Sequence, residues 1–147
     1  MIALDTNILV GAHRRDSEFH SQASEALASL AGGREPWAIP WPCVHEFFGV
    51  VTRPGVFEPA STFDEAVTQI DVWLGSPSVH LLAEATEHWS TLRELITASR
   101  TIGPRVHGAR IAAICLEHGV RELWTADRDF SRFPQLRTRN PLVGSVP

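Results

Sequence analysis

Short apolar runs alternate with amphipathic stretches along this chain, and the alternation predicts its secondary structure. The apolar runs at 2–4, 37–40, 79–82 and 122–125 resemble buried parallel strands, and 141–143 is a candidate for a short last strand. Apolar residues at helical spacing predict helices at 8–13, 19–30, 42–52, 86–98 and 106–118, with another between Thr62 and Gly75. Strands that alternate with helices indicate an α/β sandwich with a mainly parallel central sheet.

Several acids of the chain have a structural interpretation at helix starts. Thr62 and Glu65 match the capping box, in which a hydroxyl and a carboxylate accept hydrogen bonds from free backbone N–H groups. Asp64, Glu84 and Glu87 also fall near predicted helix N-termini, where negative charge is favourable. We therefore interpret these acids as part of the fold.

Length and composition predict one domain that spans residues 1–147. A hydrophobic content of 44% in 147 residues is enough for a single core. The apolar runs are too short to cross a bilayer, and the N-terminus lacks the basic start and long apolar segment of a signal peptide, so we expect a cytoplasmic protein without a membrane partner. Cys43 and Cys115, the two cysteines, fit neither a disulfide framework nor a zinc pattern.

The charge pattern excludes several classes of function. A net charge of −4 argues against a protein that coats nucleic acid electrostatically. All thirteen basic side chains are Arg, so a P-loop and the Lys-dependent phosphoryl-aspartate and receiver sites are excluded. The chain also lacks His-Glu-x-x-His and Gly-x-Ser-x-Gly. Five Arg between positions 121 and 139 form either a solvated basic face or a surface that binds phosphates or carboxylates.

Four acids remain as candidates for chemistry. Asp5 directly follows the first predicted strand, and Asp127 and Asp129 follow the fourth. Glu46 lies in the middle of the helix at 42–52, on a largely apolar face. Each has a structural alternative: Asp5 can cap a helix, Asp127 and Asp129 can form an Asx turn, and Glu46 can pair with an Arg or lie on an exposed face.

A parallel sheet can bring these acids together, because the carboxyl ends of its strands meet at one edge. Two carboxylates about 4 Å apart repel by roughly 4 kcal/mol at an effective dielectric constant near 20. A divalent cation removes that repulsion, and oxygen ligands favour Mg²⁺ or Mn²⁺ over zinc. Such an ion polarises a phosphodiester and activates water, which permits hydrolysis without a protein nucleophile.

The residues around these acids resemble a known family. The segments are Ala-Leu-Asp-Thr-Asn-Ile-Leu at 3–9, His-Glu-Phe at 45–47, Arg-Val-His-Gly-Ala-Arg-Ile-Ala-Ala at 105–113 and Leu-Trp-Thr-Ala-Asp-Arg-Asp-Phe at 123–130. In their order and spacing, over nearly the whole chain, they are similar to PIN domains and more narrowly to the VapC toxins of VapBC toxin–antitoxin pairs. The resemblance implies a PIN-like three-layer α/β/α sandwich and a Mg²⁺-dependent endoribonuclease. Such proteins are usually homodimers held inactive by a small VapB-type antitoxin.

The resemblance also assigns site residues. Asp5, Glu46 and Asp127 match three metal-binding acids of the family. The remaining metal-binding acid of the family, the third in chain order, corresponds to Gly108, which offers no ligand. Mutation of a residue that only supports the metal ligands typically costs about 10–100-fold in metal affinity or activity. Loss of a ligand itself should cost at least as much. We therefore hypothesise that the nuclease activity of this chain is impaired.

Supporting roles follow in the same way. Asn7, Thr125 and Asp129 match polar residues that orient ligands or water, and we count Asp129 with the catalytic acids. Arg128 and Arg132 are candidates for contacts with RNA phosphates. The alternative function is a catalytically inactive PIN-like domain that acts by binding antitoxin or RNA. A DNA-directed nuclease would use the same residues and differ only in substrate.

Overall fold

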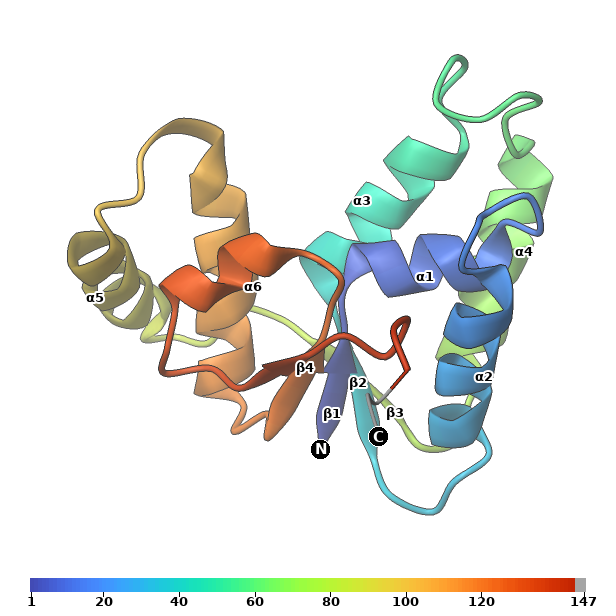
Figure 1. The fold of residues 1–147 in the computed structure, drawn as a ribbon. Helices are drawn as coiled ribbons and strands as arrows, with labels where there is room; N and C mark the ends of the chain where they lie inside the picture. Colours follow the sequence, from blue (N-terminus) through green and yellow to red (C-terminus); the bar gives the residue numbers. More distant parts are fainter. Residues whose placement is uncertain (145–147) are drawn as a thin grey trace.

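A parallel β-sheet forms the centre of the protein, shown in Figure 1 as a computed structural model that describes residues 1–144. The strand order is β3-β2-β1-β4-β5, and each neighbouring pair is parallel. The strands are β1 (Ile2–Leu4), β2 (Trp37–Pro40), β3 (Val79–Leu82), β4 (Glu122–Trp124) and β5 (Thr138–Arg139).

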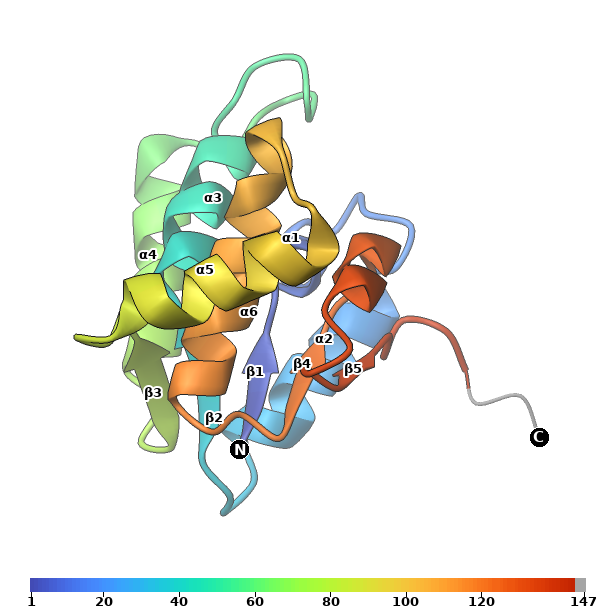
Figure 2. The same cartoon turned by 90° about the vertical axis from the view of Figure 1, so that its left-hand side faces the viewer.

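Helices cover both faces of this sheet. In Figure 1, α5 and α6 lie to the left of the strands and α2 and α4 to the right, while α1 and α3 extend from the upper end of the sheet. Figure 2 shows α5 crossing α6 on the outer side of one face. This arrangement confirms the predicted three-layer α/β/α sandwich. The helices are α1 (Thr6–His13), α2 (His20–Ala31), α3 (Trp41–Val51), α4 (Phe63–Leu74), α5 (His88–Ser99) and α6 (Val106–Glu117), with the short 3₁₀ helices η1 (Gly103–Arg105) and η2 (Arg128–Arg132).

The topology places a crevice between β1 and β4. The chain winds from β1 to β2 to β3 in one direction, then returns through α5 and α6 to β4 on the other side of β1. The winding direction therefore reverses between β1 and β4, and ligands bind beyond the carboxyl ends of the strands at such a point. Asp5 follows β1 and Asp127 lies shortly after β4, so the fold brings both acids to this crevice.

The core holds α3 in a defined orientation on the sheet. Phe47 of α3 is fully buried. Its ring packs edge-on against Trp73 of α4 at 4.7 Å between centroids and against His13 of α1 at 5.3 Å. Because Phe47 points into the core, the preceding residue Glu46 is exposed on the outer side of α3.

The last strand lies outside the predicted range. We expected a strand at 141–143, but β5 is Thr138–Arg139. The backbone N–H of Leu123 donates to the Arg137 carbonyl, which starts this pairing. Asn140 instead accepts the Leu142 N–H in an Asx turn, which ends the extended segment. The prediction was wrong because an edge strand is often polar, so its charged residues conceal it from an apolar pattern.

Three predicted helix starts are also corrected. Helix α1 begins at Thr6 instead of residue 8, because Asp5 caps it. Helix α2 begins at His20, one residue after the predicted start, and its N-cap Phe19 makes no side-chain hydrogen bond. Glu84 precedes α5 and pairs with Arg110, so it is structural but does not belong to a helix N-terminus.

Two expectations from composition have structural counterparts. None of the helices within residues 1–144 has the length and apolar character that crossing a membrane requires. Cys43 and Cys115 are buried free thiols in α3 and α6, as expected for a chain without a disulfide framework. The cytoplasmic location stays a prediction.

The capping box of α4 predicts a measurable contribution to stability. The Thr62 hydroxyl accepts the Glu65 N–H, and the Glu65 carboxylate accepts the Thr62 N–H. Thr62→Ala removes the first of these bonds and should lower the free energy of unfolding by about 1 kcal/mol in urea denaturation. Thr86→Ala is the matched control, because Thr86 precedes α5, whose N-cap makes no side-chain bond. An equal loss in both variants would contradict this role of Thr62.

The buried thiols predict low reactivity in the folded state. Burial raises the pKa of Cys115 to about 12. Burial, and then the charge of Asp5, raise the pKa of Cys43. The reactive thiolate forms only as the pH rises toward these raised pKa values, so neither thiol should react with Ellman's reagent at pH near 8. In denaturant both should react, and fast reaction of the folded protein would show that the core around α3 or α6 opens.

Candidate functional site

Asp5 is the buried centre of the site. Its side chain is only 4% exposed, and its backbone N–H donates to the Trp124 carbonyl, which extends the pairing of β1 with β4. Oδ1 accepts the Thr6 N–H at 2.8 Å and the Cys43 thiol at 3.6 Å. Oδ2 accepts the Thr125 hydroxyl at 2.7 Å and the Asn7 amide at 3.1 Å. Asp5 is therefore both the cap of α1 and a carboxylate held by donors from three segments.

The environment of Asp5 disfavours its negative charge. Burial raises the pKa of the Asp5 carboxyl, and the nearby charge of Glu46 raises it further. The hydrogen bonds from Thr125 and Thr6 oppose this rise by stabilising the ionised form, but burial has the largest effect. A bound cation would favour the ionised form and relieve its repulsion with Glu46.

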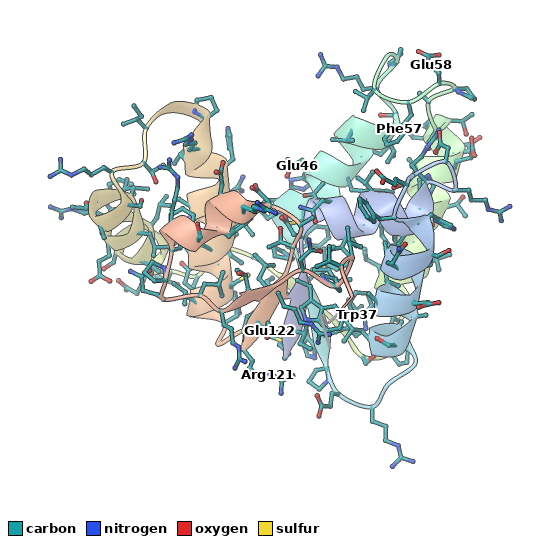
Figure 3. The ribbon with its side chains drawn as sticks, viewed as in Figure 1. Trp37, Glu46, Phe57, Glu58, Arg121 and Glu122 are labelled. Atoms are coloured by element: carbon teal, nitrogen blue, oxygen red, sulfur yellow. The ribbon has the colours of Figure 1, made fainter. Side chains whose placement is uncertain are left out.

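Glu46 lies at the upper edge of the sheet, beside Asp5. Figure 3 shows it on α3, at the opposite end of the sheet from Trp37 and Glu122. Its Oε2 accepts the Thr6 hydroxyl at 2.8 Å, so Thr6 contacts both acids. Glu46 makes no ion pair with any described residue, which removes the Arg-pair alternative and leaves an exposed acid at the crevice.

Thr125 connects Asp5 to the loop that carries Asp127. Its hydroxyl donates to Asp5 and accepts from the Asn7 amide at 3.1 Å and the Asp127 N–H at 3.0 Å, which uses its one donor and two acceptor positions. Asn7 Oδ1 also accepts the Ala126 N–H at 3.0 Å. The structure thus places Asn7 and Thr125 where they orient both strand ends.

Asp127 and Asp129 occupy the turn predicted by their structural alternative. Asp127 caps η2, and its Oδ1 accepts the Asp129 N–H at 2.9 Å. Both acids are exposed. The cap uses one oxygen of Asp127, so its other carboxylate oxygen is free to contact a ligand.

Two neighbouring cavities contain most of the predicted residues. The first, about 470 Å³, is lined by Asp5, Asn7, Glu46, His107, Gly108 and Asp127, among others. The second, about 330 Å³, shares Glu46, His107, Gly108, Asp127 and Phe130 with it and adds Arg105, Asp129 and Arg132.

Two of the predicted residues do not line these cavities. Thr125 is buried behind Asp5, to which its hydroxyl donates. Arg128 is exposed and lines neither cavity. A larger cavity of about 1010 Å³, beside His13 and Gln69, contains none of the predicted site residues. We therefore locate the candidate site in the two cavities at the β1–β4 crevice.

Gly108 leaves the site short of ligands. A Cβ atom added at Gly108 would meet no heavy atom within 4 Å. Within residues 1–144, no three His, Cys, Asp or Glu side chains approach closely enough to form a metal-binding group. The carboxylate oxygens of Asp5, Glu46 and Asp127 suit a hard divalent cation in their chemistry, but their number is low for a closed ligand set.

Sequence reasoning did not assign a role in the site to four residues. Thr6, whose hydroxyl donates to Glu46, directly follows Asp5. Cys43, which donates to Asp5, precedes Glu46 by three residues and so lies on the same helical face. Arg105 and His107 precede Gly108 in the motif of the third acid, and both line the second cavity. Their position next to Gly108 in the sequence was the signal that could have predicted a place at the site.

Comparisons with known proteins identify the family. The PIN domain family model matches residues 2–136. Ribonuclease VapC43 of Mycobacterium tuberculosis is 35% identical over 146 residues, covering 99% of both chains. Ribonuclease VapC48 of the same organism is 29% identical over 140 residues, covering 95% of this chain and 97% of its own.

Solved structures share the fold. VapBC2 from Rickettsia felis, bound to a DNA fragment from its promoter, gives a TM-score of 0.70 at 22% identity, covering 95% of this chain and 98% of its own. VapC20 of Mycobacterium tuberculosis, a sarcin–ricin loop cleaving toxin, gives 0.67 at 15% identity, covering 89% of this chain and 93% of its own. PIN-domain ribonucleases generally use a divalent metal ion. From the family model and the 35% identical relative, this chain belongs to the PIN domain family and, within it, to the VapC group.

Proposed function

We propose that this chain is a single PIN domain that serves as the toxin of a toxin–antitoxin pair and cleaves RNA as an endoribonuclease dependent on Mg²⁺ or Mn²⁺. Relatives in the same family are named ribonucleases. The observation that supports the proposal most directly is the shared cavity of Asp5, Glu46 and Asp127 at the β1–β4 crevice. Asp5 and Asp127 also cap helices, but a helix cap does not require three carboxylates from separate segments to line one cavity.

Asp5, Glu46 and Asp127 would hold the metal ion. When bound, a divalent cation supplies Lewis-acid activation of water and of the phosphodiester. Thr125 and Thr6 restrict the carboxylates of Asp5 and Glu46 through their hydroxyl bonds. Restricting the ligands in this way reduces the entropy lost when a ligand binds.

The other predicted residues would act on the substrate and on the loop. Asn7 and Thr125 hold the start of the Asp127 loop through hydrogen bonds to Ala126 and Asp127. Asp129, in the 3₁₀ helix η2 that Asp127 caps, would orient water or ligands. Arg132, and Arg128 on the outer surface, would contact RNA phosphates.

A VapB-type antitoxin and a second copy of the chain are the proposed partners. The similar structures include VapBC2 from Rickettsia felis and VapBC-1 from nontypeable Haemophilus influenzae, which supports an antitoxin partner for this chain. The homodimer is proposed from the family resemblance alone.

A specific observation favours a second function. Gly108 removes one acid from the site, and the described residues contain no group of three metal ligands. A catalytically inactive domain that binds antitoxin or RNA is consistent with both facts. A nuclease that acts on DNA would use the same acids and is distinguished by substrate alone.

Restoring the acid at position 108 should increase cleavage. Gly108 lines both cavities, and a Cβ atom at this position meets no heavy atom within 4 Å, so Gly108→Asp adds a carboxylate there. We expect cleavage of a fluorogenic RNA in Mg²⁺ to rise about tenfold or more and to disappear in EDTA. Gly49→Asp is the matched control, because Gly49 is an open helical position that lines neither cavity. Equal activity of the native chain and Gly108→Asp would reject the impairment hypothesis.

Metal binding should depend on Asp5. Asp5→Ala removes the buried carboxylate of the proposed ligand set, so calorimetric Mn²⁺ binding should be lost. Asp71→Ala, at an exposed position of α4, should bind as the native chain does. If the native chain and Gly108→Asp both bind no Mn²⁺, the inactive binding domain becomes the better description.

A further inference from the structure

We propose that the second cavity is a subsite for the RNA phosphate next to the scissile one, held by Arg105 and Arg132. The inference rests on the proposed ribonuclease function, because it requires an RNA substrate in the first cavity. It places the neighbouring nucleotide of that RNA in the second cavity. Arg132 was a candidate from sequence, whereas Arg105 enters through the structure.

Two separate elements bring the arginines to the same cavity. Arg105 is the last residue of η1 and Arg132 is the last residue of η2. Helix η1 leads directly into α6, and η2 packs against α6, so the two side chains line one space although they are distant in sequence. Two guanidinium groups in one cavity can bind a phosphate through several charge-assisted hydrogen bonds.

The backbone before Arg105 is restricted. Gly103 has φ +60°, a left-handed conformation that glycine adopts without strain. Pro104 then fixes its own φ at the start of η1. A stiff turn of this kind presents Arg105 with little backbone freedom, which lowers the entropy cost of contacting a ligand.

Both guanidinium groups are available for a ligand. Arg14, Arg110 and Arg137 form ion pairs with carboxylates. Arg105 and Arg132 form none with the described residues, although acids line the same cavity. They are therefore not neutralised within the protein, as structural arginines would be.

Charge divides the two cavities into an acidic and a basic part. The carboxylates of Glu46 and Asp127 belong to the shared region, where the metal would be held. The rest of the second cavity is lined by two guanidinium groups, of Arg105 and Arg132, and one carboxylate, of Asp129. This part therefore carries a net charge of +1, although the shared acids outweigh it over the whole cavity. A positive space beside a proposed metal site matches a phosphodiester chain, which presents a second phosphate beyond the reacting one.

The two cavities adjoin at His107 and Gly108. Both are lined by His107 and Gly108, and the direction of the missing Cβ is open space. No side chain of residue 108 therefore separates the acidic part from the basic part. In this proposal, the RNA strand runs from the acidic part to the basic part beside Gly108.

The test measures binding without cleavage. A labelled oligouridine is titrated in EDTA at several salt concentrations, and binding is followed by fluorescence anisotropy. Arg105→Gln and Arg132→Gln should each weaken binding and reduce the slope of log affinity against log salt by about 0.7, the value for one phosphate contact of a single strand. Arg105→Lys should retain the slope, because it keeps the charge.

The control is Arg121→Gln. Figure 3 shows Arg121 at the opposite end of the sheet from Glu46, so this variant should bind as the native chain does. Unchanged slopes in Arg105→Gln and Arg132→Gln, or no RNA binding by the native chain, would overturn the subsite. Cleavage of RNA by Gly108→Asp tests the ribonuclease function separately. That assay can succeed even if Arg105 and Arg132 make no contact with RNA.

Discussion

The burial of one carboxylate, that of Asp5, is the constraint on which the rest of the site depends. An ionised group taken out of water is costly unless hydrogen bonds or a cation replace its hydration. Here four donors surround it, from the first turn of α1, from the end of β4 and from α3. The junction between β1, β4 and α3 is therefore built around this charge.

The same hydrogen bonds that satisfy Asp5 organise the other acids. The Thr125 hydroxyl receives the N–H of Asp127, and the Thr6 hydroxyl reaches Glu46. Fold and site are thus coupled at these positions. Gly108 is different, since an added Cβ would touch nothing, so a change there alters the ligand set without affecting the network. Activity and stability can therefore vary independently at position 108.

Much of the fold could be predicted locally. Four strands and the order of the helices follow from apolar patterns, and the capping box of α4 from Thr62 and Glu65. Strand β5 was missed because it forms by pairing with β4 and not through its own composition. The Arg137 and Arg139 carbonyls accept hydrogen bonds from β4 and the residue after it. The start of α1 was misplaced because Asp5 serves as cap and as site residue at once.

By itself, the sequence determined the chemical identities: three acids at family positions, a glycine in place of another, and strands that end at the acids. The family positions follow from the resemblance to PIN domains, and the strands follow from local periodicity, which acts over a few residues. Only the tertiary structure decided which donors satisfy Asp5, that Arg105 and Arg132 line one cavity, and that Gly108 lines two neighbouring cavities. The reason is physical: hydrogen bonds and cavities require atoms from distant segments to meet, and chain packing alone sets those distances.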